Sequence, residues 1–207
     1  MKRIGFLFAA SFLLFTITST AGAQQFDIAF GYGTLGGNAA GDATLSDILN
    51  GNHQAQSIAG GGYPSFSGDF LFFKKYIGVG GEVTWRAHQN VDIFGQPYRP
   101  ILYDFNGVFA PPIGKRAQAE FQAGIGAQSL RFYQGFFTCG FITGCTDYVS
   151  SNHFLTHFSG GLRLYAYHNF FIRPEYHLYL VHNNFEFAGP RVTRYTVSIG
   201  YSLRNTM

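Results

Sequence analysis

Charged side chains inside otherwise apolar segments are the first candidates for chemistry in this sequence. Only 12% of its 207 residues are charged, compared with roughly 25% in a typical soluble domain. Burying an isolated charge is costly, so charges in such segments must pair with one another. We therefore expect a network of three arginines and three glutamates. Its predicted members are Arg163, Arg173, Arg194, Glu82, Glu120 and Glu175, with Arg86 and Asp104 completing the set.

One histidine and one serine have the types and spacing of a nucleophilic site. His157 and Ser159 lie two residues apart, so both side chains face the same side of an extended strand. Glu175 could orient the histidine, since an activated serine needs a base and an acidic partner. The alternative is that these three residues are polar side chains that face an enclosed interior without catalysing a reaction. We expect no catalytic residue, cofactor or metal, and keep a lipid-modifying enzyme as an alternative.

The two cysteines of the chain, Cys139 and Cys145, are separated by five residues. In an exported protein such a pair favours a disulfide. Two free thiols or a metal pair are the alternatives, but zinc would need two further ligands and this segment contains no histidine. We predict a Cys139–Cys145 disulfide that stiffens the surrounding loop.

The N-terminal segment has the pattern of an export signal. Lys2 and Arg3 precede an apolar run over residues 4–17, and an Ala-Gly-Ala site ends at Ala23. This pattern predicts a signal peptide, residues 1–23, cleaved between Ala23 and Gln24. A membrane anchor is the alternative, but it needs about 20 apolar residues. Residues 24–207 then form one domain.

Eight segments of the remaining chain alternate between large apolar residues and small or polar residues. This period of two predicts β-strands with one apolar face. Charged residues, including Asp69, fall only on the other face, together with many Gly, Ser and Ala. Aromatic residues suit a lipid-facing surface, and small polar residues suit a crowded barrel interior. The segments are 26–32, 58–72, 77–86, 101–109, 119–126, 153–164, 173–180 and 194–203.

The connections between these segments alternate between long and short, which is typical of outer-membrane barrels. We therefore predict an all-β fold, an eight-stranded antiparallel up-and-down transmembrane β-barrel; a soluble barrel is the alternative. The long connections are 35–55, 88–97, 134–151 and 182–190, and the short ones are 74–76, 111–116 and 167–169. Aromatic residues beside the short turns predict an interfacial girdle. These are Phe70, Phe72, Phe73, Tyr76, Phe109, Tyr165, Tyr167, Phe170, Phe171 and Tyr201.

With this pattern and the final strand RYTVSIGYSL over 194–203, the chain resembles the small eight-stranded barrels of the OmpA-like and OmpW-like superfamily. The resemblance covers the barrel domain only. It implies a location in the outer membrane, contact with its lipid bilayer and insertion by the barrel assembly machinery. The His157, Ser159 and Glu175 set is also similar to that of outer-membrane lipid A deacylases, although a lumenal Ser159 would face away from lipid.

The sequence indicates less about the function of the protein than about its fold. There are 14 Lys and Arg residues and 11 Asp and Glu residues, too small an excess for a nucleic-acid binder. We predict a monomeric, non-enzymatic envelope protein whose four outer loops serve adhesion, surface contact or membrane integrity. A narrow pore or path for small, possibly hydrophobic, solutes is the main alternative. A plugged lumen predicts paired arginines, whereas a pore predicts free ones.

Overall fold

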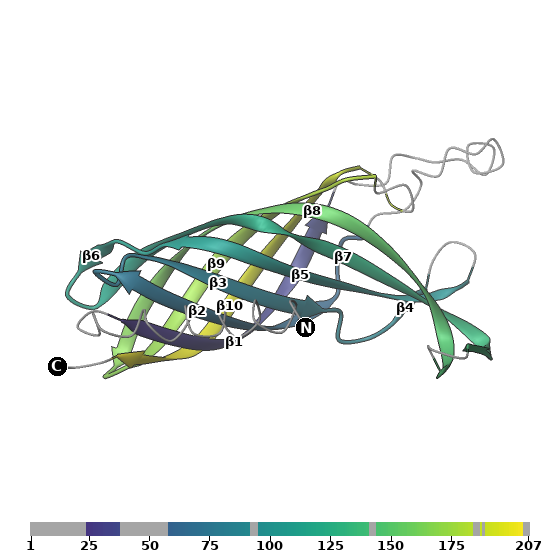
Figure 1. Cartoon of the computed structure of the whole chain (residues 1–207), viewed down its shortest axis with the longest axis horizontal. Coiled ribbons are helices and arrows are strands. Elements are labelled where there is room, and N and C mark those ends of the chain that lie inside the picture. Colours follow the sequence, from purple (N-terminus) through teal and green to yellow (C-terminus); the bar gives the residue numbers. More distant parts are fainter. Residues whose placement is uncertain are drawn as a thin grey trace, which may run out of the picture.

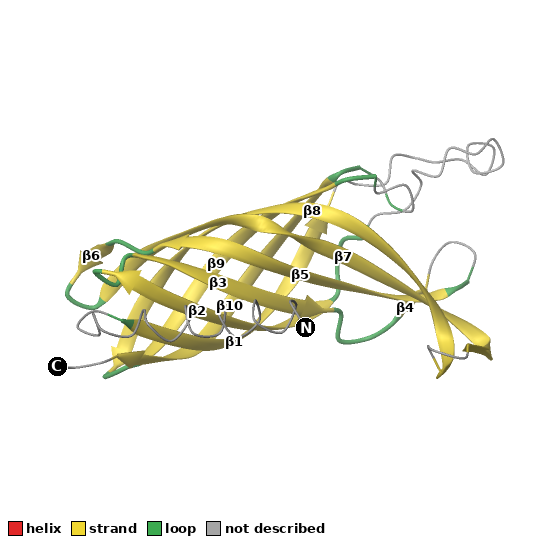
Figure 2. Cartoon of the chain, in the orientation of Figure 1, coloured by secondary structure: helices red, strands yellow, loops and turns green. Residues whose placement is uncertain are grey.

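The computed structural model describes residues 24–37, 58–91, 95–140, 144–183, 187 and 189–204. The predicted signal peptide, including Ala23, lies outside these residues, whereas Gln24 is described. Every regular element within them is a β-strand (Figure 2). No helix in the described ranges is long and apolar enough to cross a membrane. The strands are β1 (Gln25–Gly37), β2 (Gly62–Phe73), β3 (Ile77–Trp85), β4 (Asn90–Val91), β5 (Pro97–Phe109), β6 (Pro112–Gly114), β7 (Ala117–Gly140), β8 (Gly144–Tyr167), β9 (Phe170–Val181) and β10 (Arg191–Arg204).

Eight of the described strands close into a barrel (Figure 1). The ring runs in the order β1, β2, β3, β5, β7, β8, β9 and β10, and each neighbouring pair is antiparallel. Pairing of β10 with β1 closes the ring. The short strands β4 and β6 extend the edges of β5 and β7. The predicted eight-stranded antiparallel barrel is confirmed.

Short turns gather at one end of the barrel, which we call the turn end. They connect β2 with β3 at 74–76, β6 with β7 at 115–116, and β8 with β9 at 168–169. Lys74, Lys75 and His168 have positive φ angles of 47°, 61° and 45°. Left-handed turn residues match the twist of tight antiparallel hairpins. The opposite end, where the predicted long connections begin, is the loop end.

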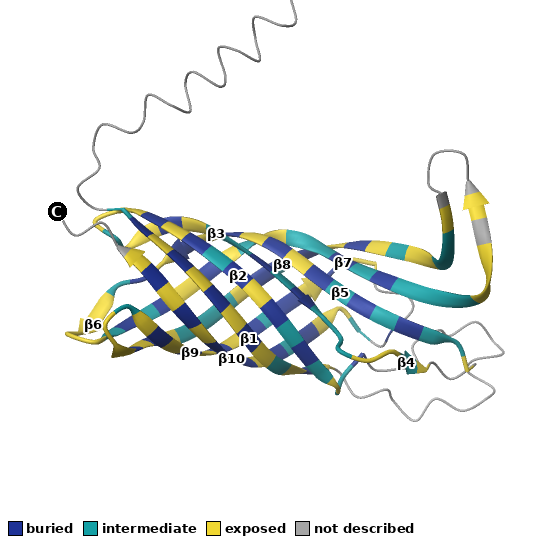
Figure 3. Cartoon of the chain, turned by 90° about the horizontal axis from the view of Figure 1, so that it is seen from below, coloured by how far each residue is buried: buried dark blue, intermediate teal, exposed yellow. Residues whose placement is uncertain are grey.

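One long connection differs from the prediction. Residues 134–151 were expected to form a loop, but β7 continues to Gly140 and β8 begins at Gly144. A register irregularity lies between Tyr133 and Thr138, after which Cys139 pairs with Cys145. The period of two is weak in this segment, whose Gly and Thr residues also suit turns, so the sequence did not reveal the strands. The paired segments project beyond the barrel (Figures 1 and 3).

The outer surface of the barrel is apolar. Exposed and buried residues alternate along the strands (Figure 3), and the exposed register is the aromatic and aliphatic one predicted. Phe105 on β5, opposite Gly81 in the middle of β3, has 73% of its surface exposed. Two girdle residues were predicted wrongly, because Tyr165 and Phe171 are buried inside the barrel. Both occupy the inward register of their strands, and clustering in sequence alone concealed that parity.

The lumen is filled by two zones of different chemistry. The half near the turn end holds charged and polar side chains, and the half near the loop end holds an apolar cluster, which we call the apolar plug. Glycine makes room for large side chains: a methyl group at Gly200 would lie 2.2 Å from Cζ of Phe171. The apolar plug consists of Leu35, Ile58, Tyr63, Tyr98, Leu102, Leu130, Leu155, Tyr179, Val181, Phe187 and Val192.

Candidate functional site

The polar half of the lumen contains a buried ion cluster around two arginines. Arg163 on β8 forms ion pairs with Asp27 on β1 and Glu120 on β7. Its Nη2 also lies 3.1 Å from Oδ2 of Asp69. Arg173 on β9 lies 2.8 Å from the Asp69 carboxylate and 2.7 Å from that of Glu120. The two arginines therefore share two carboxylates and cross-link β1, β2, β7, β8 and β9.

This inner ion cluster is extended by Glu175 on β9. Nε of Arg173 lies 3.0 Å from Oε2 of Glu175, and the Ser198 hydroxyl donates to the same oxygen over 3.1 Å. Gln122 donates to Glu120 over 2.6 Å. Such additional donors are what a buried ion pair needs to offset its desolvation. We define the inner ion cluster as Asp27, Asp69, Glu120, Arg163, Arg173 and Glu175.

A second cluster lies between the inner ion cluster and the apolar plug. Arg194 on β10 forms an ion pair with Glu82 on β3, and its Nη2 lies 3.0 Å from Nε2 of His177. Nδ1 of His177 lies 3.0 Å from Nε2 of His157. Nδ1 of His157 in turn lies 2.9 Å from the Asn106 side-chain oxygen. One neutral tautomer of each histidine satisfies this whole chain of hydrogen bonds.

Most of the residues in the predicted charge network lie in these two clusters. The predicted partners Arg163, Arg173, Glu120 and Glu175 come together in the inner ion cluster. Glu82 and Arg194 pair in the second cluster. Nδ1 of His157 also lies 3.3 Å from Oδ1 of the predicted member Asp104. The Arg194–Glu82 and His157–Asp104 contacts join strands that are not neighbours in the ring, so only the closed barrel brings them together. Glu120 and Arg163 lie on neighbouring strands, and Arg173 and Glu175 lie on one strand.

Arg86, another predicted member of the network, lies apart from both clusters. Nε of Arg86 would lie 2.7 Å from a methyl group at Gly61, near the loop end. Within the described part of the chain it forms no ion pair. Asp27 and His177 were not predicted from the sequence to be members of the network. Their inward register was the available signal for both residues.

The possible nucleophilic site is not assembled. His157 uses its two ring nitrogens toward Asn106 and His177, and no hydrogen bond joins it to Ser159 in the described residues. Ser159 pairs in register with His177 on β9 and Gln122 on β7. In the inward register, these side chains also lie away from the lipid-facing surface. No group of three or more potential metal ligands occurs among the described residues.

The apolar plug closes the loop end of the lumen. Tyr98 on β5 and Phe187, from the connection between β9 and β10, contact each other with ring centroids 5.1 Å apart. Both rings are buried, as are Leu130 and Leu155 of the same cluster. Inward side chains of an eight-stranded barrel are expected to fill it. The lumen near the loop end is therefore packed like a protein core.

The projecting part of the β7–β8 hairpin is the second candidate site. We call residues 133–140 and 144–148 the outer ribbon, because β5 pairs with β7 only as far as Phe132. A disulfide joins Cys139 and Cys145. Phe136 and Phe137 are 66% and 74% exposed. Isolated two-stranded hairpins are marginally stable in water, so the cross-link holds together a ribbon with exposed aromatic residues that could not rely on a core.

The comparisons with known proteins identify the fold and no closer relationship. No protein-family model and no curated protein sequence matches the chain. Ail of Yersinia pestis, solved with the heparin analogue sucrose octasulfate, matches with a TM-score of 0.56 and 14% identity over 87% of this chain and 99% of Ail. Neisserial surface protein A matches with a TM-score of 0.56 and 6% identity, over 86% of this chain and 96% of that protein. The N-terminal β-barrel domain of Pseudomonas aeruginosa OprF matches with a TM-score of 0.50 and 11% identity, over 88% of this chain and 98% of that domain.

These matches confirm the resemblance in fold to small outer-membrane barrels. The apolar outer surface of the barrel supports the same conclusion independently, because soluble proteins rarely expose so large a contiguous apolar surface to water. A closed antiparallel barrel satisfies every ladder hydrogen bond without water, as a membrane requires. The chain is therefore a barrel of the outer-membrane type, a type in which the short turns face the periplasm.

Proposed function

We propose that the protein is a non-enzymatic surface protein whose closed barrel holds the outer ribbon in place to contact a partner outside the cell. The ribbon carries this proposal. It is cross-linked by a disulfide and exposes Phe136 and Phe137 beyond the barrel. Exposed aromatic residues away from lipid are typical of contact sites. Two proteins with the same fold are named for attachment and for the surface, which agrees with this role.

Changing both phenylalanines of the outer ribbon to serine should remove surface contact without unfolding the barrel. The expected result is that F136S/F137S reduces adherence of a non-adherent Gram-negative host producing the protein to the level of the host alone. Adherence to epithelial cells and to immobilised sulfated glycosaminoglycans would be counted. V91S is the matched control, since Val91 is exposed near the loop end but lies outside the ribbon. Unchanged adherence of F136S/F137S, with normal surface exposure, would refute the proposal.

A path for small apolar solutes is the second candidate, and the apolar plug favours it. Apolar side chains line the loop end of the lumen, and Phe187 belongs to a connection rather than to the barrel wall. A connection that moved aside would uncover an apolar pocket. This candidate needs the plug to open, whereas surface contact needs it to stay closed.

Single-channel recording of refolded residues 24–207 separates the two candidates. We expect a silent planar bilayer, because ion pairs and the apolar plug fill the lumen. In parallel, uptake of a small apolar dye into proteoliposomes should be the same for the wild type and for Phe187→Ala. Dye uptake that rises in Phe187→Ala would favour the solute path. Steady ion conductance in the wild type would contradict both a closed barrel and the proposed display role.

A further inference from the structure

The turn end of the barrel has a basic surface. Three lysines occur in residues 24–207, and all of them lie in the short turns, next to one arginine. We call these residues, Lys74, Lys75, Lys115 and Arg116, the basic rim. No acidic residue occurs in the three turns, and none of the four side chains forms an ion pair within the described ranges. Unlike the lumenal arginines, these cations have no carboxylate partner in the described barrel, and Lys74 lies over the ring of Phe73.

The backbone of the basic rim is held in place by hydrogen bonds from each turn to a neighbouring strand or connection. The amide of Ala110 donates to the carbonyl of Tyr76 over 2.6 Å, and the amide of Tyr165 donates to that of Arg116 over 2.9 Å. The amide of Ser202 donates to the carbonyl of Asn169 over 2.9 Å. The backbone of each turn is thus anchored to the neighbouring part of the ring. Turns with an anchored backbone lose less conformational freedom on binding than flexible turns.

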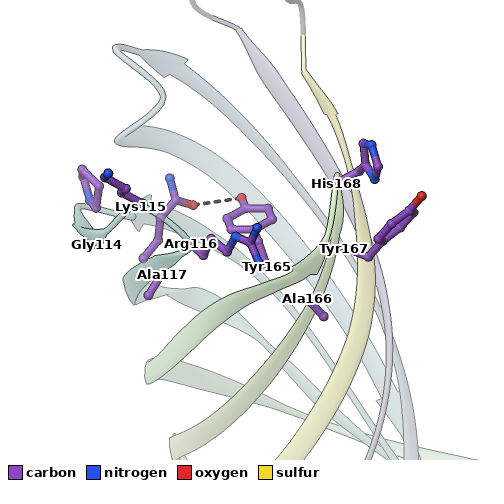
Figure 4. Close-up of a pocket in the computed structure, with 10 residues that line it drawn as sticks. Gly114, Lys115, Arg116, Ala117, Tyr165, Ala166, Tyr167 and His168 are labelled. Carbon is purple, nitrogen blue, oxygen red and sulfur yellow. Dashed lines mark hydrogen bonds between the residues drawn. The ribbon is translucent and has the colours of Figure 1, made fainter.

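A pocket opens within this surface between the β6–β7 turn and the end of β8 (Figure 4). Its volume is about 580 Å³, within the range of roughly 300–1,000 Å³ typical of small-molecule sites. Lys115 and Arg116 line one side, and Tyr167 and His168 line the other. At its base the hydroxyl of Tyr165 donates to Gln118 over 3.0 Å. The lining is therefore cationic and rich in hydrogen-bond donors, and it contains no carboxylate.

The pocket lies at the level of the membrane–water interface. Exposed aromatic and aliphatic side chains surround the turn end: Phe73, Tyr76, Phe109, Ile113, Tyr167 and Phe170. Aromatic residues of this kind mark the headgroup level of a bilayer. A ligand in the pocket would therefore approach from the periplasmic leaflet. The phosphate groups of phospholipids lie at this depth.

We propose that this pocket binds the phosphate group of an anionic phospholipid in the periplasmic leaflet. The Arg116 guanidinium can hold two phosphate oxygens at once, while Lys115 adds a point charge. His168 supplies a further ring N–H donor. The exposed ring of Tyr167 can pack against the glycerol and upper acyl chain. This site would anchor the barrel in register with its membrane, and it does not depend on the outer ribbon.

Titration with a short-chain phosphatidylglycerol tests the proposal. Refolded residues 24–207, labelled with ¹⁵N, would be held in alkyl maltoside micelles, which contain no phosphate. We expect saturable shifts of the backbone amide signals at 115–118 and 165–168. A basic residue near an anionic lipid surface contributes about 1 kcal/mol, so K115Q/R116Q should weaken binding by roughly 10- to 30-fold. Circular dichroism and the heat-dependent gel mobility of the barrel would verify folding.

The matched control is K74Q/K75Q, which removes the same charge from the neighbouring turn. We expect it to weaken binding by no more than about threefold, since each residue contributes only to the general field. Equal losses in the two double variants would overturn the pocket, because diffuse rim charge would then explain binding. Equal affinity for short-chain phosphatidylcholine would overturn the preference for an anionic lipid. Inorganic phosphate binding as tightly as phosphatidylglycerol would assign the pocket to free phosphate instead.

Discussion

Replacing Arg163 with methionine is expected to lower the free energy of unfolding by about 3–5 kcal/mol. The substitution leaves the buried carboxylates of Asp27, Asp69 and Glu120 without one of their cations. Arg173 still reaches Asp69 and Glu120, whereas among the described side chains Asp27 keeps only the side-chain amide of Gln25. Urea unfolding in phospholipid vesicles, followed by the fluorescence of the single tryptophan, Trp85, would measure the change.

Two further variants serve as controls for the Arg163→Met measurement. Arg191→Met removes an exposed arginine at the start of β10 and should change stability by less than about 0.5 kcal/mol. Arg163→Lys keeps the charge but loses the planar fork that reaches three carboxylates, so we expect an intermediate loss. If Arg163→Met matches Arg191→Met, the inner ion cluster is not holding the barrel together. A destabilised variant that also conducts ions would show that the cluster plugs the lumen.

Placing an arginine on the outer face of β5 is the second change with a large expected effect. Phe105→Arg puts a charge among lipid chains near the middle of the barrel wall, and such a change costs roughly 2–4 kcal/mol at the bilayer midplane. The same unfolding measurement in vesicles would detect it. The loss should be greater in bilayers than in detergent micelles, because micelles admit water more easily.

Phe137→Arg is the matched control for Phe105→Arg. Phe105 and Phe137 are 73% and 74% exposed, so the two substitutions differ mainly in the solvent around the side chain. Phe137 lies in the outer ribbon, in water, and its replacement should change stability by less than about 0.5 kcal/mol. Equal effects of the two variants would mean that the outer face of β5 meets water. That outcome would contradict the membrane-spanning assignment.

Local periodicity predicted most of the barrel because inward and outward residues alternate strictly along each strand. Phe66 and Asp69, for example, face opposite sides of β2, as their spacing requires. The alternation fails as a guide where residues are small or where aromatic side chains occupy both registers. The outer ribbon and the inward rings of Tyr165 and Phe171 were therefore missed.

The sequence by itself determined that β-strands with one apolar and one charged face must close into a barrel, because lipid leaves no strand edge or isolated charge unpaired. It could not determine which charges meet. Asp27 and Arg163 are far apart along the chain and form a pair across the lumen. The pocket at the turn end joins residues 112–118 with 165–168, which the register between β7 and β8 brings together. Such contacts depend on how the ring closes and on the register between strands, which one strand's pattern does not contain.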